Sequence, residues 1–217
     1  MFKFTPKLNQ ETRDIIENKE KLKELANCYG SPLNILFPNV MDKNISNFKE
    51  TLKEHHLSGK IYYAHKCNKS NSFLKQALQN QINVDVASLE ELKSALSNGF
   101  TGDRIEATGP KNDDFIILGI RHNIIFNVDN LEEIKKINYF KEKIQTKNKI
   151  RILLRLNGFK SEETRIINRN SRFGTPKSQV NKLIEYAQEN DKNLEIIGIS
   201  FHLDTVNVKE KILAIEN

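Results

Sequence analysis

Short apolar runs and longer amphipathic stretches alternate along most of the chain. Six runs have the length and composition of strands. They occupy residues 60–64, 82–87, 104–108, 123–128, 150–156 and 194–201. The stretches between them carry apolar residues at three- and four-residue spacing, which is typical of a helix that buries one face. After the second run, for example, Leu89, Leu92 and Ala95 fall on one side. The pattern therefore predicts about six strand–helix units in a row.

The N-terminal part of the chain is organised differently. Residues 10–29 predict one helix that ends at Gly30, because glycine readily adopts the backbone conformation that follows a helix. An apolar run at residues 33–37 predicts a short strand, and residues 40–56 predict another helix. The break at Gly30 leads us to expect a helical lead-in over residues 1–30 and a second domain over the remainder.

Strands that alternate with helices favour a parallel sheet and hence an α/β fold. Periodicity does not distinguish between two architectures, a doubly wound open sheet and a (β/α)8 barrel. A barrel has eight strands, whereas residues 31–217 supply about six strand–helix units. Within this part, Pro176 is expected to open the helix before the last strand, and residues 206–215 begin a further helix.

The composition is that of a globular protein, with 38% hydrophobic and 29% charged residues. No apolar stretch reaches the roughly 18 residues that indicate a membrane span. The N-terminus becomes polar before the apolar core of a signal peptide could form, so we expect a cytoplasmic protein. Cys28 and Cys67 have no metal-ligand spacing and suggest no disulfide framework, so no metal site is predicted.

The net charge of 34 − 28 = +6 raises the possibility of nucleic-acid binding. However, the lysines are scattered among glutamates, as in KEKLKEL and EEIKK. Intermixed signs of this kind are typical of solvated helix faces. We therefore expect no nucleic-acid partner, and we expect any positive pocket to receive an anionic small molecule.

The segment YYAHKCN places Lys66 where the first strand of the repeating pattern ends. In parallel α/β folds the active site lies at the carboxyl ends of the strands. A partly desolvated lysine at that edge can act as an amine nucleophile toward an aldehyde. Position alone leaves a solvated surface lysine as the alternative.

Three further residues combine polar chemistry with strand positions. His202 ends the sixth strand, where its ring could stack on a planar ligand or transfer protons, or serve only as a structural histidine. Asp85 interrupts an apolar strand, and Arg155 is its natural counterpart on the fifth strand. A buried carboxylate is costly unless it is paired or used. A functional cluster beside Lys66 and a structural ion pair remain equal alternatives.

Several segments, read in order, carry a family resemblance over residues 29–205. They are YGSPL, YYAHKCN, DVASLEEL, ATGPK, LLRLN followed by SRFG, and GISFHLDT. Together they resemble the fold-type III pyridoxal-phosphate-dependent decarboxylases, the group of the ornithine, diaminopimelate and arginine decarboxylases. Each motif alone is weak, but their order and spacing make the resemblance specific.

This resemblance implies a barrel of the alanine racemase-like (β/α)8 kind, incomplete here with about six units and without the C-terminal β-domain. It implies pyridoxal 5'-phosphate held as a Schiff base by Lys66, with His202 stacked on the cofactor as a second catalytic residue. The implied cofactor-binding residues are Lys66, Asp85, Ser88, Glu91, Arg155, His202 and Thr205. Asn68 is implied as a supporting residue and Arg172 as a basic residue near a dimer contact.

The implied activity is decarboxylation of a small-molecule amino acid, either diaminopimelate or a basic amino acid, by a homodimer. The family's phosphate loop and β-domain have no counterpart in this sequence, so we expect these residues alone to be an inactive fragment. The alternatives are a non-catalytic pyridoxal-phosphate-binding barrel protein and an inactive remnant. Two positions depart from the family pattern: His65, where a small apolar residue is common, and Asp204, where glycine is common.

Overall fold

The computed structural model describes residues 8–158, 172–203 and 208–216. It divides into two compact units, Met1–Gly59 and Lys60–Asn217. The domain boundary expected near Gly30 stays a prediction.

In the part that the structure describes, the first unit contains three helices rather than the two helices and the strand that the sequence predicts. They are α1 (Gln10–Glu17), α2 (Lys19–Tyr29) and α3 (Val40–Glu54). The predicted single helix over residues 10–29 is wrong because Asn18 interrupts it. The Asn18 side chain accepts a hydrogen bond from the Lys21 N–H at 2.9 Å and so begins a new helix. Gly30 ends α2 with a φ of 87°, as predicted.

The strand predicted at residues 33–37 is also wrong, because these residues form no strand. A strand is stabilised by pairing with a neighbour, which an apolar run alone does not guarantee.

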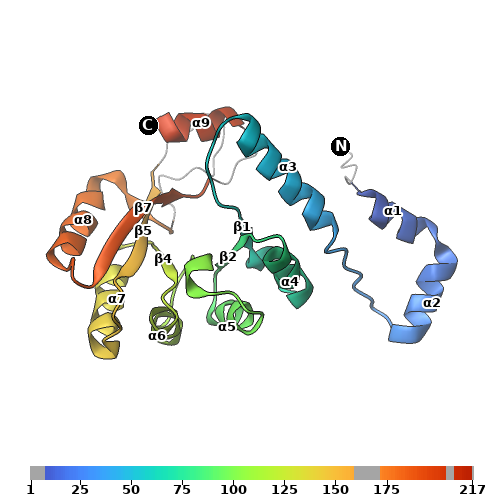
Figure 1. Ribbon diagram of the computed structural model, residues 1–217, viewed down its shortest axis with the longest axis horizontal. Helices are drawn as coiled ribbons and strands as arrows, with labels where there is room; N and C mark the ends of the chain where they lie inside the picture. The colour runs from blue at the N-terminus through green and yellow to red at the C-terminus, as the bar shows by residue number, and fades with distance from the viewer. Residues whose placement is uncertain (1–7, 159–171, 204–207, 217) are drawn as a thin grey trace. The chain divides into compact units, whose positions relative to one another are not determined.

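The second unit contains a parallel sheet whose strands follow the predicted runs (Figure 1). The strands are β1 (Tyr62–Ala64), β2 (Asn83–Val86), β3 (Ile105–Ala107), β4 (Ile125–Val128), β5 (Ile150–Asn157), β6 (Thr175–Pro176) and β7 (Leu194–Phe201). Strands β1 to β5 lie side by side in chain order, and both β6 and β7 pair with β5. The short β6 contacts only the last part of β5, while β7 runs along most of it.

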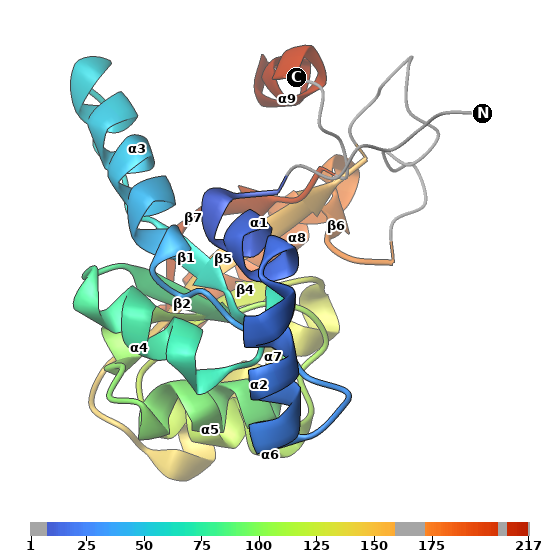
Figure 2. The same cartoon turned by 90° about the vertical axis from the view of Figure 1, so that its right-hand side faces the viewer.

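Helices connect these strands and cover one face of the sheet (Figures 1 and 2). The connecting helices are α4 (Asn71–Gln79), α5 (Leu89–Ser97), α6 (Asp113–Arg121), α7 (Leu131–Ile144) and α8 (Val180–Glu189), and α9 (Val208–Glu216) follows β7. The described connections also include the 3-10 turns η1 (His65–Cys67), η2 (Gly102–Arg104) and η3 (Lys177–Gln179). The helix expected to open at Pro176 therefore begins with η3, since Pro176 itself ends β6.

The core lies between the sheet and the covering helices. Strand residues Val84, Val86 and Phe126 are fully buried on this side. The helices contribute buried apolar residues that include Leu74, Leu92, Phe115, Ile116, Ile134 and Ile137. Successive strand residues point to opposite faces, so the opposite face carries Asp85, Glu106 and Asn127. This polar face contains the candidate site.

Helix α6 approaches β4 closely at Gly119. A Cβ atom added there would lie 2.5 Å from the Phe126 ring and 2.7 Å from the Ile124 side chain. Alanine usually stabilises a helix by about 1 kcal/mol relative to glycine. At Gly119 we expect the opposite, a loss of about 1–3 kcal/mol in the free energy of unfolding from overpacking.

Chemical denaturation of Gly119→Ala, Phe126→Leu and the double variant tests this contact. The double variant should lose less stability than the two single losses combined, because a smaller side chain relieves the overlap. Additive losses, or a gain for Gly119→Ala alone, would contradict the packing described for α6 and β4.

Candidate active site at the carboxyl ends of the strands

Lys66 lies in η1, directly after β1, at the edge where the parallel strands end. Its side chain is exposed, and its amine makes no hydrogen bond or ion pair among the described residues. The turn that carries it is closed from within, since the Asn68 N–H donates to the His65 carbonyl at 3.2 Å. The Tyr63 hydroxyl adds a hydrogen bond to the Asn68 carbonyl at 2.8 Å. Burial raises the pKa of Tyr63 to about 12, so this hydroxyl keeps its proton.

Asp85 lies on β2 opposite Ala64, two residues before Lys66. One carboxylate oxygen, Oδ1, accepts a hydrogen bond from the Thr108 hydroxyl at 2.8 Å. Burial raises the pKa of Asp85, and the hydrogen bond from Thr108 and the charges of Lys66 and Arg155 only partly oppose this. The structure thus brings Lys66, Asp85 and Arg155 within electrostatic reach of one another.

Arg155 does not form the expected direct ion pair with Asp85. Its guanidinium NH1 lies 3.5 Å from Oδ1 of Asp129, and the guanidinium carbon lies 5.1 Å from the centre of the Phe173 ring. Neither the functional cluster nor the ion pair considered from the sequence included this arrangement, because Asp129 follows β4 and Phe173 precedes β6. These residues meet only when the strands pair.

Glu106 is a polar-face residue that the sequence analysis missed. It lies opposite Asp85 on the neighbouring strand. Its Oε1 accepts a hydrogen bond from the Asn127 amide at 2.8 Å, and the Asn127 Oδ1 accepts one from the Ser200 hydroxyl at 2.7 Å. Burial raises the pKa of Glu106, and the Asp85 charge raises it further. The alternation in RIEAT was the available signal, because it gives Glu106 the same parity as Asp85.

Ser88 and Glu91 serve the helix that follows β2. The Ser88 hydroxyl accepts a hydrogen bond from the Glu91 N–H at 3.2 Å, and Glu91 Oε2 accepts one from the Ala87 N–H at 2.9 Å. This is a variant of the capping box at the start of α5, in which the glutamate bonds to the residue before the cap. The other oxygen, Oε1, lies 3.1 Å from the Lys69 amine. These contacts assign both residues a structural role, and their expected role in cofactor binding stays a prediction.

The same device recurs two strand–helix pairs further along, before α7. Asn130 caps the helix at the Glu133 N–H, and Glu133 accepts a hydrogen bond from the Asp129 N–H at 2.8 Å. Here the lysine partner, Lys111, is completely buried. Its amine donates to the Gly109 and Asn127 carbonyls at 2.8 and 2.7 Å and to Glu133 at 3.0 Å. All three donors are satisfied, so Lys111 joins β3, β4 and α7.

His202 follows β7 at the same edge, two residues after Ser200, and is exposed. Thr205 and Asp204 lie outside the described residues. The predicted stacking of His202 on a cofactor therefore stays a prediction, as does any role of Thr205.

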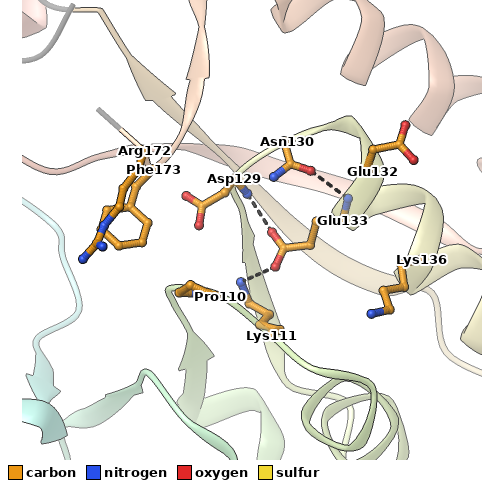
Figure 3. A pocket seen from close by; sticks show the side chains of 9 residues that line it. All are labelled: Pro110, Lys111, Asp129, Asn130, Glu132, Glu133, Lys136, Arg172 and Phe173. Carbon is orange, nitrogen blue, oxygen red and sulfur yellow. Dashed lines mark hydrogen bonds and ion pairs between the residues drawn. The ribbon is translucent and has the colours of Figure 1, made fainter. Parts of the chain in front are cut away.

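A cavity of about 510 Å³ lies beside this edge (Figure 3). Its lining residues are Pro110, Lys111, Asp129, Asn130, Glu132, Glu133, Lys136, Arg172 and Phe173. Asp129 Oδ1 accepts a hydrogen bond from the Gly174 N–H at 2.8 Å and so holds the Arg172–Phe173 segment at the wall. The Arg172 guanidinium carbon lies 4.7 Å from the centre of the Phe173 ring.

No described residues gather into a group suited to a metal ion, and no described helix is long and apolar enough to cross a membrane.

Comparison with known proteins identifies relatives of this chain. The family described as "Pyridoxal-dependent decarboxylase, pyridoxal binding domain" matches residues 40–211. A probable ornithine decarboxylase of Dictyostelium discoideum is 32% identical over 66% of this chain and 30% of its own length. The diaminopimelate decarboxylase of Aquifex aeolicus is 26% identical over 92% of this chain and 47% of its own length. The chain thus spans between about a third and about half of these relatives.

Solved structures agree with this assignment. The crystal structure of AQ1208 from Aquifex aeolicus has a TM-score of 0.75 and 27% identity, covering 90% of this chain and 45% of that protein. A diaminopimelate decarboxylase from M. jannaschi has a TM-score of 0.79 at 23% identity, covering 89% of this chain and 48% of that protein. These likenesses confirm the predicted fold, an α/β arrangement that forms part of a (β/α)8 barrel.

Removal of the buried lysine should be costly. In Lys111→Met, Glu133 keeps a buried charge without its lysine, and we expect the free energy of unfolding to fall by about 3–5 kcal/mol. In the control Lys93→Met, an exposed pair with Glu90 is lost, and the change should stay below about 1 kcal/mol. Urea denaturation of both variants makes the comparison. Equal losses would show that the Lys111 cluster contributes no more than a surface pair.

The raised pKa of Asp85 predicts a pH-dependent stability. A carboxyl whose pKa is raised on folding is destabilising above its unfolded pKa, and this cost disappears as the pH falls and the group becomes protonated. Asp85→Asn removes the charge and keeps an oxygen for Thr108. We therefore expect this variant to be more stable than the wild type at neutral pH, with a difference that narrows on acidification.

Thermal unfolding of wild type and Asp85→Asn across the mildly acidic range measures this difference. The exposed Asp191→Asn serves as the control, and it should follow the wild type throughout. A wild type that is more stable than Asp85→Asn at neutral pH would mean that Asp85 is held by a strong ion pair.

Proposed function

Since the chain belongs to the family of pyridoxal-dependent decarboxylases, over its pyridoxal-binding domain, we propose that Lys66 holds pyridoxal 5'-phosphate covalently through its amine. The observation that carries this proposal is the position of Lys66. It lies at the carboxyl end of a parallel strand, its amine is free of partners among the described residues, and the carboxyl group of Asp85 lies nearby. An amine already committed to an ion pair would have to break it before it could react with an aldehyde.

The charges around Lys66 fit this role. Asp85 stands close enough to interact with the lysine charge, and it also interacts with Arg155. A carboxylate beside an amine can orient it and hold a proton near it, and a guanidinium on the same face can attract an anionic group. We propose that Asp85 orients the Lys66 amine and that Arg155 balances the two half-buried carboxyls, Asp85 and Glu106.

Two other predicted residues enter the proposal with less structural support. His202 lies at the same edge of the sheet and supplies a ring of the size that stacks on a planar ligand. Thr205 keeps its predicted role near the cofactor on the family resemblance alone. We propose both as cofactor-binding residues.

The activity proposed for the whole protein is decarboxylation of diaminopimelate or of a basic amino acid. Bound pyridoxal phosphate supplies an electron sink for the pair left when carbon dioxide departs. The relatives named as ornithine and diaminopimelate decarboxylases support this substrate class. The resemblance also supports a homodimer and a cytoplasmic location, and both belong to this proposal.

Borohydride reduction in the presence of pyridoxal phosphate, followed by peptide mass mapping, tests the proposed lysine. We expect the reduced adduct on the peptide that contains Lys66, and we expect Lys66→Arg to abolish it. The exposed Lys93 provides a matched control, because Lys93→Arg should leave labelling of Lys66 unchanged. Labelling spread over many lysines, or labelling that survives in Lys66→Arg, would contradict the proposal.

A further inference from the structure

His65 is a buried histidine directly beside Lys66. Its side chain is only 1% exposed, and neither ring nitrogen makes a hydrogen bond among the described residues. The backbone of Lys69 lies near the ring without meeting hydrogen-bond geometry. A buried polar group without a partner is unfavourable, and such a group in a native structure calls for an explanation.

The surroundings of His65 point to the turn that carries Lys66. The His65 ring centre lies 6.3 Å from that of Tyr63, which in turn stacks on Phe73 of α4 with 6.1 Å between ring centres. Tyr63 pairs with the core position Val84, so these rings lie on the side of β1 that faces the helices. The same two residues close the turn, since Asn68 bonds to the His65 carbonyl and Tyr63 bonds to the Asn68 carbonyl.

Adjacent side chains thus have opposite environments, with His65 buried and Lys66 exposed. A side chain that is fixed on one side of a tight turn determines where its neighbour emerges. The charged and titratable groups that face the His65 ring are Glu91, Lys69 and Tyr63. Glu91 already binds the Lys69 amine and the Ala87 N–H.

We propose that His65 is a positioning residue for Lys66: its neutral ring, buried behind η1, holds the turn that presents the Lys66 amine at the strand ends. Protonated His65 would be drawn to the Glu91 carboxylate in competition with Lys69, and the turn would loosen. Burial lowers the pKa of His65 and outweighs the attraction of Glu91, so the neutral form is favoured in the folded protein. The inference rests on the proposed function of Lys66 for its consequence, but the positioning itself can be measured without any cofactor.

The test compares His65→Ala and His65→Phe with the wild type. Truncation to alanine removes the buried ring, and we expect amide hydrogen exchange at Asn68 to accelerate by about tenfold or more while β2 to β5 stay protected. Phenylalanine keeps a ring without a titratable group, so exchange at Asn68 should stay within about threefold of the wild type. Selective labelling of Lys66 by pyridoxal phosphate and borohydride should follow the same order.

A purely packing role of His65 would not make hydrogen exchange at Asn68 depend on pH, so acidification distinguishes the two roles. Between neutral pH and about pH 5, the range in which histidine titrates, the wild type should lose protection at Asn68 while His65→Phe keeps it. His122→Phe, a change at an exposed histidine after α6, should behave like the wild type.

The inference would be overturned if the Asn68 amide were as protected in His65→Ala as in the wild type. It would also be overturned if acidification reduced protection equally in the wild type and in His65→Phe. If His65→Ala does not fold, the acidification comparison decides alone, because it uses only the wild type and the phenylalanine variant. Failure to label Lys66 in the wild type would instead refute the proposed function, and hydrogen exchange would still decide the role of His65.

Discussion

Side-chain alternation across a parallel sheet is the constraint on which the rest of this structure depends. Each strand offers one face to the helices and one to the opposite side. The helix face is filled by fully buried apolar residues such as Val84, Ile105 and Phe126. The opposite face therefore receives every polar residue of alternate parity, and on neighbouring strands this brings Asp85 and Glu106 together. Burial raises the pKa of both carboxyls, and the Asp85 charge raises the pKa of Glu106 further. They are tolerated because Thr108 and Asn127 donate hydrogen bonds to them.

Capping chemistry at the strand ends gives this face a rigid rim. The starts of α5 and α7 are fixed by the same pair of hydrogen bonds. The cap, Ser88 or Asn130, accepts from the backbone N–H of Glu91 or Glu133, and that glutamate accepts from the residue before the cap. Each glutamate also binds a lysine from the loop of the previous strand–helix pair, Lys69 for Glu91 and Lys111 for Glu133. Lys66 differs from these two lysines in having no such partner among the described residues. Lys69 and Lys111 are therefore engaged in structural ion pairs, whereas the Lys66 amine is exposed beside Asp85.

Much of the fold could be predicted from local pattern, and the failures have physical causes. The six apolar runs at 60–64 and beyond became parallel strands because each combines strand composition with a following amphipathic helix. The break at Asn18 was missed because asparagine is compatible with either a helix interior or a cap, and the choice depends on local hydrogen bonds. The strand at 33–37 was wrong because strand formation requires a partner that the run itself does not specify.

The candidate site was partly predictable for the same reason. Lys66, Asp85 and Arg155 follow from strand ends and charged positions within strands. The pairing of Arg155 with Asp129, and the chain of bonds from Glu106 through Asn127 to Ser200, depend on strand register. Register joins residues far apart in the sequence, so local periodicity does not reveal it. The family resemblance identified Lys66, but it did not predict that the neighbouring His65 would be buried behind the turn.

The central claim is that the Lys66 amine, beside Asp85, is the point of covalent attachment. A crystal structure of the protein grown with pyridoxal phosphate tests it most directly. The account predicts continuous electron density from Nζ of Lys66 to the cofactor, with the Asp85 carboxyl beside it. Density joined to a different lysine, or a cofactor bound away from the carboxyl ends of the strands, would contradict it.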